Sequence, residues 1–410
     1  MSAQHLLPFY ADTLSQIADT WGTPCYVYDQ TTLEATYAAF ENALHGQAHQ
    51  LCYAVKANPS LAILQVFARL GAGFDIVSAG ELQRVIAAGG DPARVVFSGV
   101  GKRSDEIAMA LKAGIHCFNV ESEAELLRIH HIATELNLYA PISLRVNPDV
   151  DARTHPYIST GLKTSKFGVA YDDALRLYGI AHTLPHIRII GIDCHIGSQL
   201  TETAPFVDAL ERVLSLVDAL TTQGITLQHI DLGGGLGITY QHEYPPTIAD
   251  YIHALRDKLA GRMLAVLLEP GRALVGNAGV LLTRIEYLKH GDEHNFAIVD
   301  AAMNDLVRPA LYAAWHDIVP VHPRNGTQQP WEIVGPVCES GDFLGHARSL
   351  ILEQGDLLAI CSAGAYGMSM SSNYNSRPRA AEVMVLRDGT PRLIRARESI
   401  TSLFAGELLT

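Results

Sequence analysis

Short apolar or β-branched runs alternate with helical patterns along the first two-thirds of the chain. The runs that predict strands are Gln50–Val55, Gly73–Val77, Arg94–Ser98, His116–Val120, Ile142–Val146, Ile187–His195, His229–Leu232 and Leu264–Leu268. Helical patterns such as Glu81–Ala88, Ser104–Ala113 and Glu123–Asn137 lie between them. Strands that alternate with helices predict parallel βαβ units. Eight units are the number that closes a (β/α)8 TIM barrel, and a doubly wound open sheet is the alternative.

After Arg272 the pattern changes, because glycine and proline punctuate the runs and no regular helices separate them. The candidate strands here are Gly279–Leu288, Phe296–Val299, Glu332–Val334, Asp356–Ile360 and Ala381–Leu386. They predict a mostly antiparallel β-sandwich or β-barrel domain. The segment Thr23–Tyr28 precedes the first barrel strand, so we expect it to join this sheet. The predicted domains are therefore a barrel, 29–275, and a β domain, 1–28 plus 276–410.

Composition narrows the possible partners. The 410 residues carry a formal net charge of −13 and no clustered lysines or arginines, which argues against a nucleic acid or an anionic membrane as partner. No run approaches the roughly 20 apolar residues of a membrane-spanning helix, and residues 1–5 do not resemble a secretory signal. The six cysteines are scattered, as expected of mostly buried, reduced thiols. We expect a cytoplasmic protein.

Candidate chemistry gathers where the barrel strands end, which is where barrels place their active sites. Lys56 directly follows the first strand, Asp75 lies at the end of the second, and His195 follows the sixth. Each has a structural alternative: a lysine snorkelling at a strand end, a capping aspartate, a buried histidine with satisfied hydrogen bonds. Shared placement at one barrel mouth favours a common pocket.

The seventh and eighth strands end in groups suited to an anion. Gly233, Gly234 and Gly235 follow the seventh strand, where backbone N–H groups can approach a phosphate closely. This run does not match the dinucleotide G-x-G-x-x-G pattern. Glu269 and Arg272 follow the eighth strand and supply a carboxylate and a guanidinium. A surface ion pair is the structural alternative for these two.

The order of these motifs resembles that of the fold-type III pyridoxal-5′-phosphate (PLP) dependent decarboxylases, and among them the diaminopimelate decarboxylases. The likeness covers nearly the whole chain. The motifs are Tyr53-Ala-Val-Lys-Ala-Asn58, Phe97-Ser-Gly-Val-Gly-Lys102, His195-Ile-Gly-Ser198, Gly233-Gly-Gly-Leu-Gly237, Glu269-Pro-Gly-Arg272, Cys338-Glu-Ser-Gly-Asp342, Ala363-Gly-Ala-Tyr-Gly367 and Asn373-Tyr-Asn-Ser-Arg-Pro378.

The resemblance implies a role for each candidate residue. Lys56 would hold PLP as a Schiff base, His195 would stack on the cofactor ring, and Glu269 would face the pyridine nitrogen. The other implied cofactor contacts are Asp75, Ser198, Gly233, Gly234, Gly235, Gly271, Arg272 and Tyr366. The implied substrate contacts are Arg272, Arg308, Tyr312, Glu339 and Tyr366. Cys338 would donate a proton across the interface of a homodimer, and no metal is implied.

Charge favours one reaction among those of the family. An ornithine or arginine side chain ends in a cation, whereas meso-2,6-diaminopimelate carries a carboxylate beside its distal ammonium. Arg308, Tyr312 and Arg272 could hold that carboxylate and Glu339 the ammonium, which predicts decarboxylation to L-lysine and CO2.

The alternatives are a decarboxylase of ornithine, arginine or carboxynorspermidine, and a PLP-binding protein without turnover. A racemase is disfavoured by Glu269 and the Cys338 loop. A metal-dependent hydrolase is disfavoured because the acids at the strand ends appear scattered in the sequence.

Overall fold

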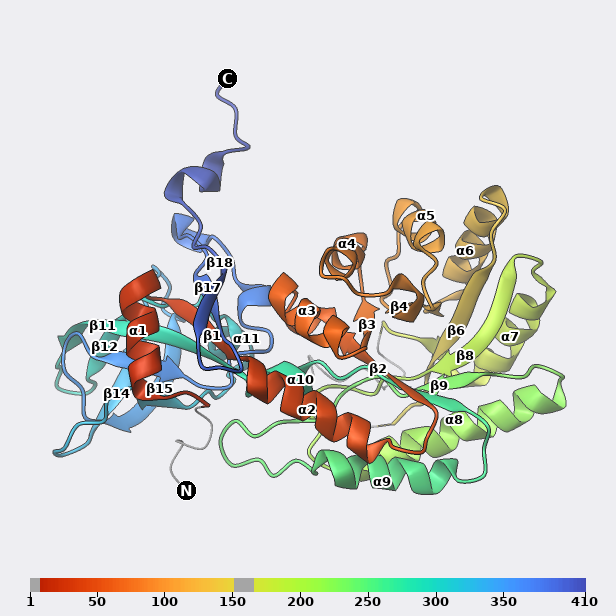
Figure 1. Ribbon diagram of the computed structural model, residues 1–410, viewed down its shortest axis with the longest axis horizontal. Helices are drawn as coiled ribbons and strands as arrows, with labels where there is room; N and C mark the ends of the chain where they lie inside the picture. Colours follow the sequence, from red (N-terminus) through yellow and green to blue (C-terminus); the bar gives the residue numbers. More distant parts are fainter. Residues whose placement is uncertain (1–7, 151–165) are drawn as a thin grey trace. The chain divides into compact units, whose positions relative to one another are not determined.

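The computed structural model describes residues 8–150 and 166–410 and divides into two compact units (Figure 1). One comprises Ala35–Ile238 and Tyr244–Ala273. The other comprises the chain up to Glu34, Thr239–Glu243 and Leu274–Thr410. Residues 1–5, where we expected no secretory signal, lie outside the described residues. The domain limits inferred from the sequence stay a prediction.

The first unit is a closed barrel of eight parallel strands, as predicted. They are β2 (His49–Ala54), β3 (Gly73–Ile76), β4 (Val95–Phe97), β5 (Cys117–Val120), β6 (Ala140–Asn147), β8 (Ile187–Asp193), β9 (His229–Asp231) and β10 (Ala265–Leu268). Each pairs with its neighbour, β10 pairs with β2, and β5 pairs with β6, which closes the ring. A two-residue strand, β7 (Val169–Ala170), adds to the end of β6. The open-sheet alternative is therefore wrong.

Helices surround this ring (Figure 1). They are α3 (Leu61–Arg69), α4 (Ala79–Ala87), α5 (Ser104–Ala113), α6 (Glu123–Glu135), α7 (Ala174–Thr183), α8 (Ala204–Thr222) and α9 (Ile248–Leu259). Two of them start at a serine cap: Ser78 accepts from the Glu81 N–H at 3.2 Å, and Ser122 accepts from the Glu125 N–H at 3.2 Å. These bonds satisfy N–H groups that the first helical turn leaves without a partner.

The second unit contains a nine-stranded mixed sheet. Its strands are β1 (Cys25–Asp29), β11 (Gly279–Lys289), β12 (Phe296–Val299), β13 (Ile318–Pro320), β14 (Gln329–Val334), β15 (Phe343–Leu350), β16 (Leu357–Ile360), β17 (Ala381–Val385) and β18 (Pro391–Arg395). Seven of the nine lie in the order β15-β14-β12-β11-β1-β17-β18, while β16 pairs with β11 and β13. Most pairs are antiparallel, but β1–β17 and β12–β14 are parallel. The short helices α10 (Arg272–Val275) and α11 (Arg308–Tyr312) border these strands in sequence.

The N-terminal strand β1 lies inside this sheet, as predicted, between β11 and β17. Its apolar residues, including Cys25 and Val27, pack with Val280 and Val383 and with the helix α1 (Ala11–Trp21) in one buried cluster. Residues 25–28 are all buried, which explains why no charged residue precedes Asp29 in this strand. The sequence reading missed β13, β15 and β18. β15 and β18 carry polar residues such as His346 and Arg392, and β13 is only three residues long. The helix α2 (Gln30–Ala43) leads from β1 into the barrel strands.

Among the described residues, no helix is both long enough and apolar enough to cross a membrane.

Candidate active site

The lysine at the end of the first barrel strand is held by a buried carboxylate. β2 ends at Ala54, and one 3-10 turn, Val55–Ala57, carries Lys56. The Lys56 Nζ lies 2.6 Å from Asp75 Oδ2 on the neighbouring strand β3. The lysine side chain is 40% exposed, whereas that of Asp75 is fully buried. Lys56 and Asp75 thus form an ion pair. The lysine side chain is accessible from solvent, and the aspartate that balances its charge is buried in the barrel.

His195 packs against the glycine-rich loop that follows β9. The backbone N–H of Gly234 donates to His195 Nδ1 at 3.3 Å. A side chain at Gly233 would place its Cβ 2.6 Å from the same nitrogen. Burial lowers the pKa of His195 well below its usual value, and the cations Arg145 and Lys56 lower it further. The imidazole is therefore neutral, with Nδ1 as the acceptor.

The glycine loop lies too close to its surroundings to carry side chains. Gly233 and Gly235 have φ angles of +63° and +113°, which disfavour other residues. A Cβ at Gly234 would lie 2.4 Å from the Glu269 carbonyl oxygen. Nearby, Arg272 donates to Ser198 Oγ at 3.0 Å. The barrel unit thus brings together a glycine loop that a ligand can approach closely, a hydroxyl and a guanidinium, and these groups suit a phosphate.

Gly271 belongs to the same tightly packed region. A Cβ at this position would lie 3.0 Å from the side chain of Ala57 and 3.1 Å from that of Ala54. The loop after β10 therefore packs against the turn that carries Lys56.

Glu269 is buried at the end of β10 and held by two donors that we did not predict. Its Oε1 accepts from Asn119 Nδ2 at 3.2 Å and from Ser98 Oγ at 3.4 Å. Asn119 also donates to Ser98, at 3.1 Å. Burial raises the pKa of Glu269 well above its usual value, and the nearby carboxylates Asp231 and Asp75 raise it further.

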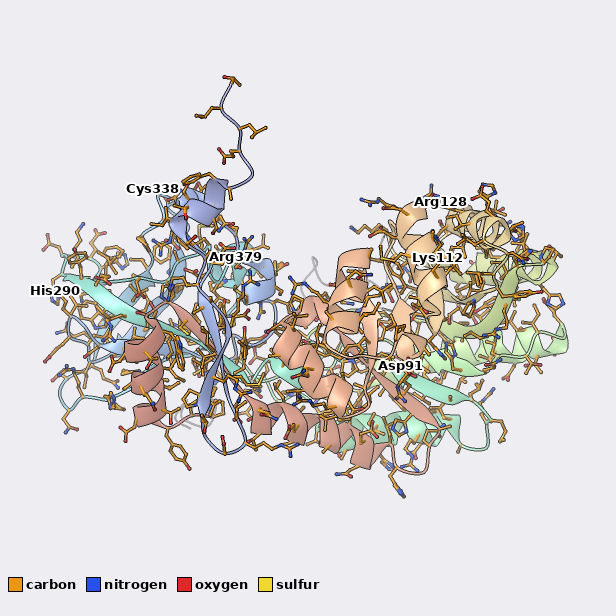
Figure 2. The ribbon with its side chains drawn as sticks, turned by 45° about the horizontal axis from the view of Figure 1, so that its top comes forward. Asp91, Lys112, Arg128, His290, Cys338 and Arg379 are labelled. Carbon is orange, nitrogen blue, oxygen red and sulfur yellow. The ribbon has the colours of Figure 1, made fainter. Side chains whose placement is uncertain are left out.

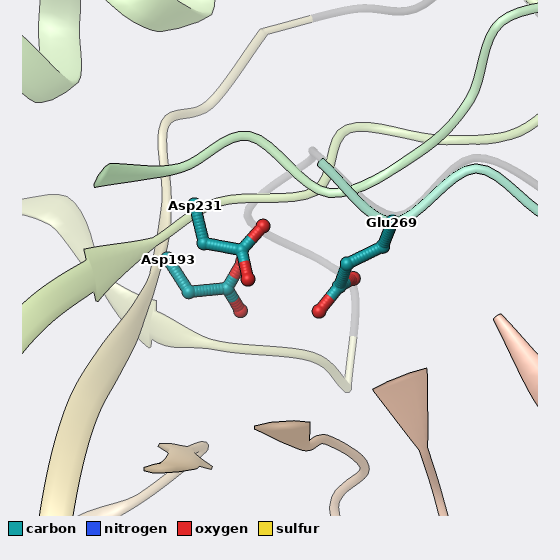
Figure 3. A group of neighbouring side chains, drawn as sticks. All are labelled: Asp193, Asp231 and Glu269. Carbon is teal, nitrogen blue, oxygen red and sulfur yellow. The ribbon is translucent and has the colours of Figure 1, made fainter. Parts of the chain in front are cut away.

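Three acids converge at this point. Asp193 at the end of β8, Asp231 at the end of β9 and Glu269 offer oxygens that all lie within 4.8 Å of one another (Figure 3). The expectation that the strand-end acids are scattered is therefore wrong. It failed because the sequence places them about 40 residues apart, whereas adjacent parallel strands bring their carboxyl ends together.

The predicted proton donor lies in the second unit. Cys338 is the exposed one of the six cysteines, and the other five are buried (Figure 2). Its N–H donates to Asn375 Oδ1 at 3.0 Å. Asn375 and Ser376 both have positive φ angles, an uncommon strain for consecutive non-glycine residues. Glu339, also exposed, accepts a hydrogen bond from the Tyr374 hydroxyl. The motifs at Cys338 and Asn373 thus form one surface.

Arg308 is buried within the second unit. It donates to the Tyr240 hydroxyl at 2.6 Å, and its guanidinium lies 4.8 Å from the centre of the Tyr240 ring. His316 Nε2 lies 3.4 Å from the same guanidinium. Tyr312 ends the helix α11 that begins at Arg308 and is half-buried.

Tyr366 is half-buried in the same unit and has a φ of +56°. A non-glycine residue held in the left-handed region is a sign of functional constraint.

Sequence reasoning missed Ser98, Asn119, Asp193, Asp231 and Tyr240. Asp193 and Asp231 could have been found, because each is the last residue of a strand and lies two positions before a quoted motif. Ser98 lies in the motif that starts at Phe97, but its hydroxyl carried no signal of its own. Tyr240 offered none, since its partner Arg308 is 68 residues away.

The barrel residues fit PLP. The accessible amine suits its aldehyde, the glycine loop beside Arg272 suits its phosphate, and the converging buried carboxylates suit its basic ring nitrogen. The neutral His195 offers a flat face and adds no positive charge.

Comparison with known proteins agrees with this fit. Residues 30–276 match the family model described as "Pyridoxal-dependent decarboxylase, pyridoxal binding domain". The chain is 60% identical to the diaminopimelate decarboxylase of Pseudomonas aeruginosa, covering 97% of this chain and 95% of that one. It is 58% identical to the enzyme of the same name from Vibrio cholerae, covering 96% and 94%.

A solved structure is similar over the same extent. The diaminopimelate decarboxylase of Helicobacter pylori, in complex with L-lysine, is 42% identical with a TM-score of 0.93, covering 96% of this chain and 98% of that one. By these matches, which span both units, the chain belongs to the diaminopimelate decarboxylase family of pyridoxal-dependent decarboxylases.

Proposed function

We propose that this protein decarboxylates meso-2,6-diaminopimelate to L-lysine and CO2 with PLP as its cofactor. The observation that carries the proposal is the barrel mouth, where the Lys56 amine, neutral His195 and buried Glu269 accompany a glycine cradle. Relatives of nearly the full length that bear the name diaminopimelate decarboxylase support it.

Lys56 is the residue we propose to hold the cofactor. An amine reacts only after it loses its proton, and Asp75 Oδ2 lies 2.6 Å away, within reach of that proton. Gly233, Gly234, Gly235 and Gly271, with Ser198 and Arg272, would bind the phosphate through N–H, hydroxyl and guanidinium donors. His195 would cover one face of the ring, and Tyr366 would add a contact from the second unit.

PLP supplies an electron sink for the electron pair left on the α-carbon when the bond to the carboxyl group breaks. Glu269 would face the ring nitrogen and keep a proton there. The hydrogen bonds from Ser98 and Asn119 hold its Oε1, so its Oε2 would be the oxygen that binds the ring nitrogen. A carboxyl group with a raised pKa suits this role, because it can share a proton with a weak base.

Substrate choice would depend on charge in the second unit. Arg308 keeps its charge while buried, held by Tyr240 and His316. With Tyr312 and Arg272 it would bind the distal carboxylate of diaminopimelate, and Glu339 would bind the distal ammonium. A substrate that ends in a cation alone would lack the carboxylate that we propose this guanidinium binds.

We propose that the active protein is a homodimer. Cys338 would give its thiol proton to the α-carbon in place of the departed carboxyl group, acting on a site of the partner subunit. The exposure of the Cys338 and Glu339 surface in the single chain supports this arrangement. Six cysteines without a disulfide also suit the reducing cytoplasm that we propose as its location.

The test supplies purified protein and PLP with meso-diaminopimelate, ornithine or arginine in separate reactions and measures CO2 and the amine product. We expect lysine from diaminopimelate and no product from the other two. Turnover of ornithine would refute the substrate proposal while keeping the decarboxylase. PLP binding without any turnover would refute the enzyme itself.

A further inference from the structure

The charges at the barrel mouth do not balance. In the described part of the barrel, the ionisable groups that face one another there are the acids Asp75, Glu121, Asp193, Asp231 and Glu269 and the cations Lys56 and Arg145. Lys56 pairs with Asp75 at 2.6 Å, and Arg145 pairs with Glu121 at 3.1 Å. Arg145 also forms a longer ion pair with Asp193, at 3.9 Å. Two cations therefore face five acids, of which Asp193, Asp231 and Glu269 converge within 4.8 Å (Figure 3).

Two of these acids present buried oxygens that accept no hydrogen bond from the described residues. They are Asp193 Oδ1 and Asp231 Oδ2. Asp193 is 1% exposed and Asp231 is fully buried. The second oxygen of Asp231 accepts from the Gly233 N–H at 2.9 Å, and Arg145 Nε lies 3.9 Å from Asp193 Oδ2. Buried carboxylates without donors are costly, so the cluster must take up protons or a cation.

We propose that Asp231 and Asp193 act with Glu269 as one site for the protonated ring nitrogen of the cofactor, with Asp231 as the positioning residue. This inference rests on the proposed function and extends it. Glu269 alone would touch the ring, while Asp231 sets how strongly Glu269 and the ring nitrogen retain a shared proton. The cofactor would thus bring the positive charge that the protein lacks here.

The direction of the pKa shifts agrees with this geometry. Burial raises the pKa of Asp231 to about 6, and Asp75 also raises it, while the Gly233 N–H lowers it. Burial and the neighbouring Asp231 raise the pKa of Asp193. For Glu269, Asp75 and Asp193 act in the same direction as Asp231, and Lys56 opposes them. His195 is neutral and adds no compensating charge.

The variant that isolates this effect is Asp231→Asn. Asparagine is nearly the same size and keeps an oxygen that can accept from Gly233, while it removes the negative charge and turns the other oxygen into an N–H donor. The matched control is Asp208→Asn, which removes one negative charge from an exposed position on α8 of the same unit. If Asp231→Asn does not fold, Asp193→Asn is the second variant.

The first measurement compares binding of PLP with that of its 1-deaza analogue, in which CH replaces the ring nitrogen. Wild-type protein should prefer PLP, since the analogue cannot carry the proton. In Asp231→Asn we expect the ratio of the two dissociation constants to fall about tenfold, as for a change of one unit in proton affinity. In Asp208→Asn the ratio should stay unchanged. General damage to the pocket would weaken both ligands alike and leave the ratio unaltered.

The second measurement follows the Tm of the protein without PLP as pH changes. A carboxyl group whose folded-state pKa is raised stabilises fully below its unfolded pKa of about 4, and that stability is lost as pH rises through the folded value of about 6. Asp231→Asn removes this loss of stability with rising pH. Its Tm relative to wild type should therefore increase from about pH 4.5 to about pH 7, with no such trend in Asp208→Asn.

The outcomes separate cleanly. An unchanged ligand ratio in both Asp231→Asn and Asp193→Asn would overturn the inference and leave the proposed function intact. Failure of wild-type protein to bind PLP would overturn the proposed function. If Mg²⁺ or Mn²⁺ alone raised the Tm of PLP-free wild type but not of Asp231→Asn, the cluster would be a metal site and the inference would be wrong.

Discussion

The barrel mouth and the Cys338 surface of the second unit carry candidate chemistry in opposite settings. Asp75 and Glu269 are 1% and 7% exposed. Asp75 contacts Lys56 after the neighbouring strand β2, and Glu269 contacts Asn119 on β5, which does not pair with β10. Cys338, Glu339 and Tyr374 are exposed. A dry pocket fixes charges and shifts their pKa values within one chain, whereas an exposed surface is screened by water until something covers it.

This difference indicates which part of the chemistry a single chain can complete. The barrel residues already have the burial that strong electrostatic effects require. The Cys338 surface has the strained Asn375–Ser376 turn of a functional site but not the burial. A second copy of the chain would supply this burial, and for this reason we propose that the exposed group acts in a homodimer.

The largest expected effect tests whether the barrel residues of one chain act together with the Cys338 surface of another. Lys56→Ala should lower turnover on the order of 10⁴-fold, because it removes the reacting amine. Cys338→Ala should lower it by about 10²–10⁴-fold, as for loss of a proton donor. If the sites are shared, mixing the two inactive proteins should restore about a quarter of wild-type activity, since half of the random dimers hold one intact site. Steady-state lysine production measures it.

The control mixes Lys56→Ala with Asp75→Asn, which alters the same unit and cannot complement. Activity from the control mixture would contradict a shared site. So would a lack of activity in the first mixture when subunits are known to exchange, because Cys338 would then not act in the partner's site.

The barrel was predictable because its signals are local. Eight strand runs, the caps at Ser78 and Ser122 and the left-handed Gly89 all depend on residues close in sequence. The Asp193–Asp231–Glu269 cluster depends instead on strand order, which brings residues nearly 40 positions apart to one point. The sequence shows each acid but not that the three lie together, and their clustering sets the charge of the pocket.

The second unit was less predictable for a related reason. β15 and β18 lie at the two ends of the main strand order. Few of their residues are buried and several are polar, so no long apolar run marks them in the sequence. Tyr240 lies in a five-residue segment, Thr239–Glu243, that follows the glycine loop in sequence but belongs to the second unit. There it contacts Arg308 on the helix α11. Neither feature has a periodic signature.

A smaller effect is expected at Arg308, the buried cation of the second unit. Arg308→Ala should weaken transition-state binding of diaminopimelate by about 2–5 kcal/mol, and kcat/KM should fall accordingly. Any turnover of ornithine should change far less. Tyr240→Phe is the matched variant, because it removes the hydroxyl that Arg308 contacts at 2.6 Å but leaves the charge. It should keep the preference. An unchanged preference in Arg308→Ala would remove its proposed role.

The smallest effect is expected on the exposed surface itself. Tyr374→Phe removes the hydroxyl that donates to Glu339, and an exposed hydrogen bond of this kind contributes at most about 1 kcal/mol. If Glu339 binds the distal ammonium, KM for diaminopimelate should rise by about two- to fivefold with kcat nearly constant, because the bond orients a binding group and not the reacting atoms. Tyr287→Phe, at a 62% exposed tyrosine on β11, should change neither constant. A fall in kcat with KM unchanged would mean that Tyr374 acts on Cys338 through the Asn375 turn, and the exposed surface would then govern proton transfer and not substrate choice.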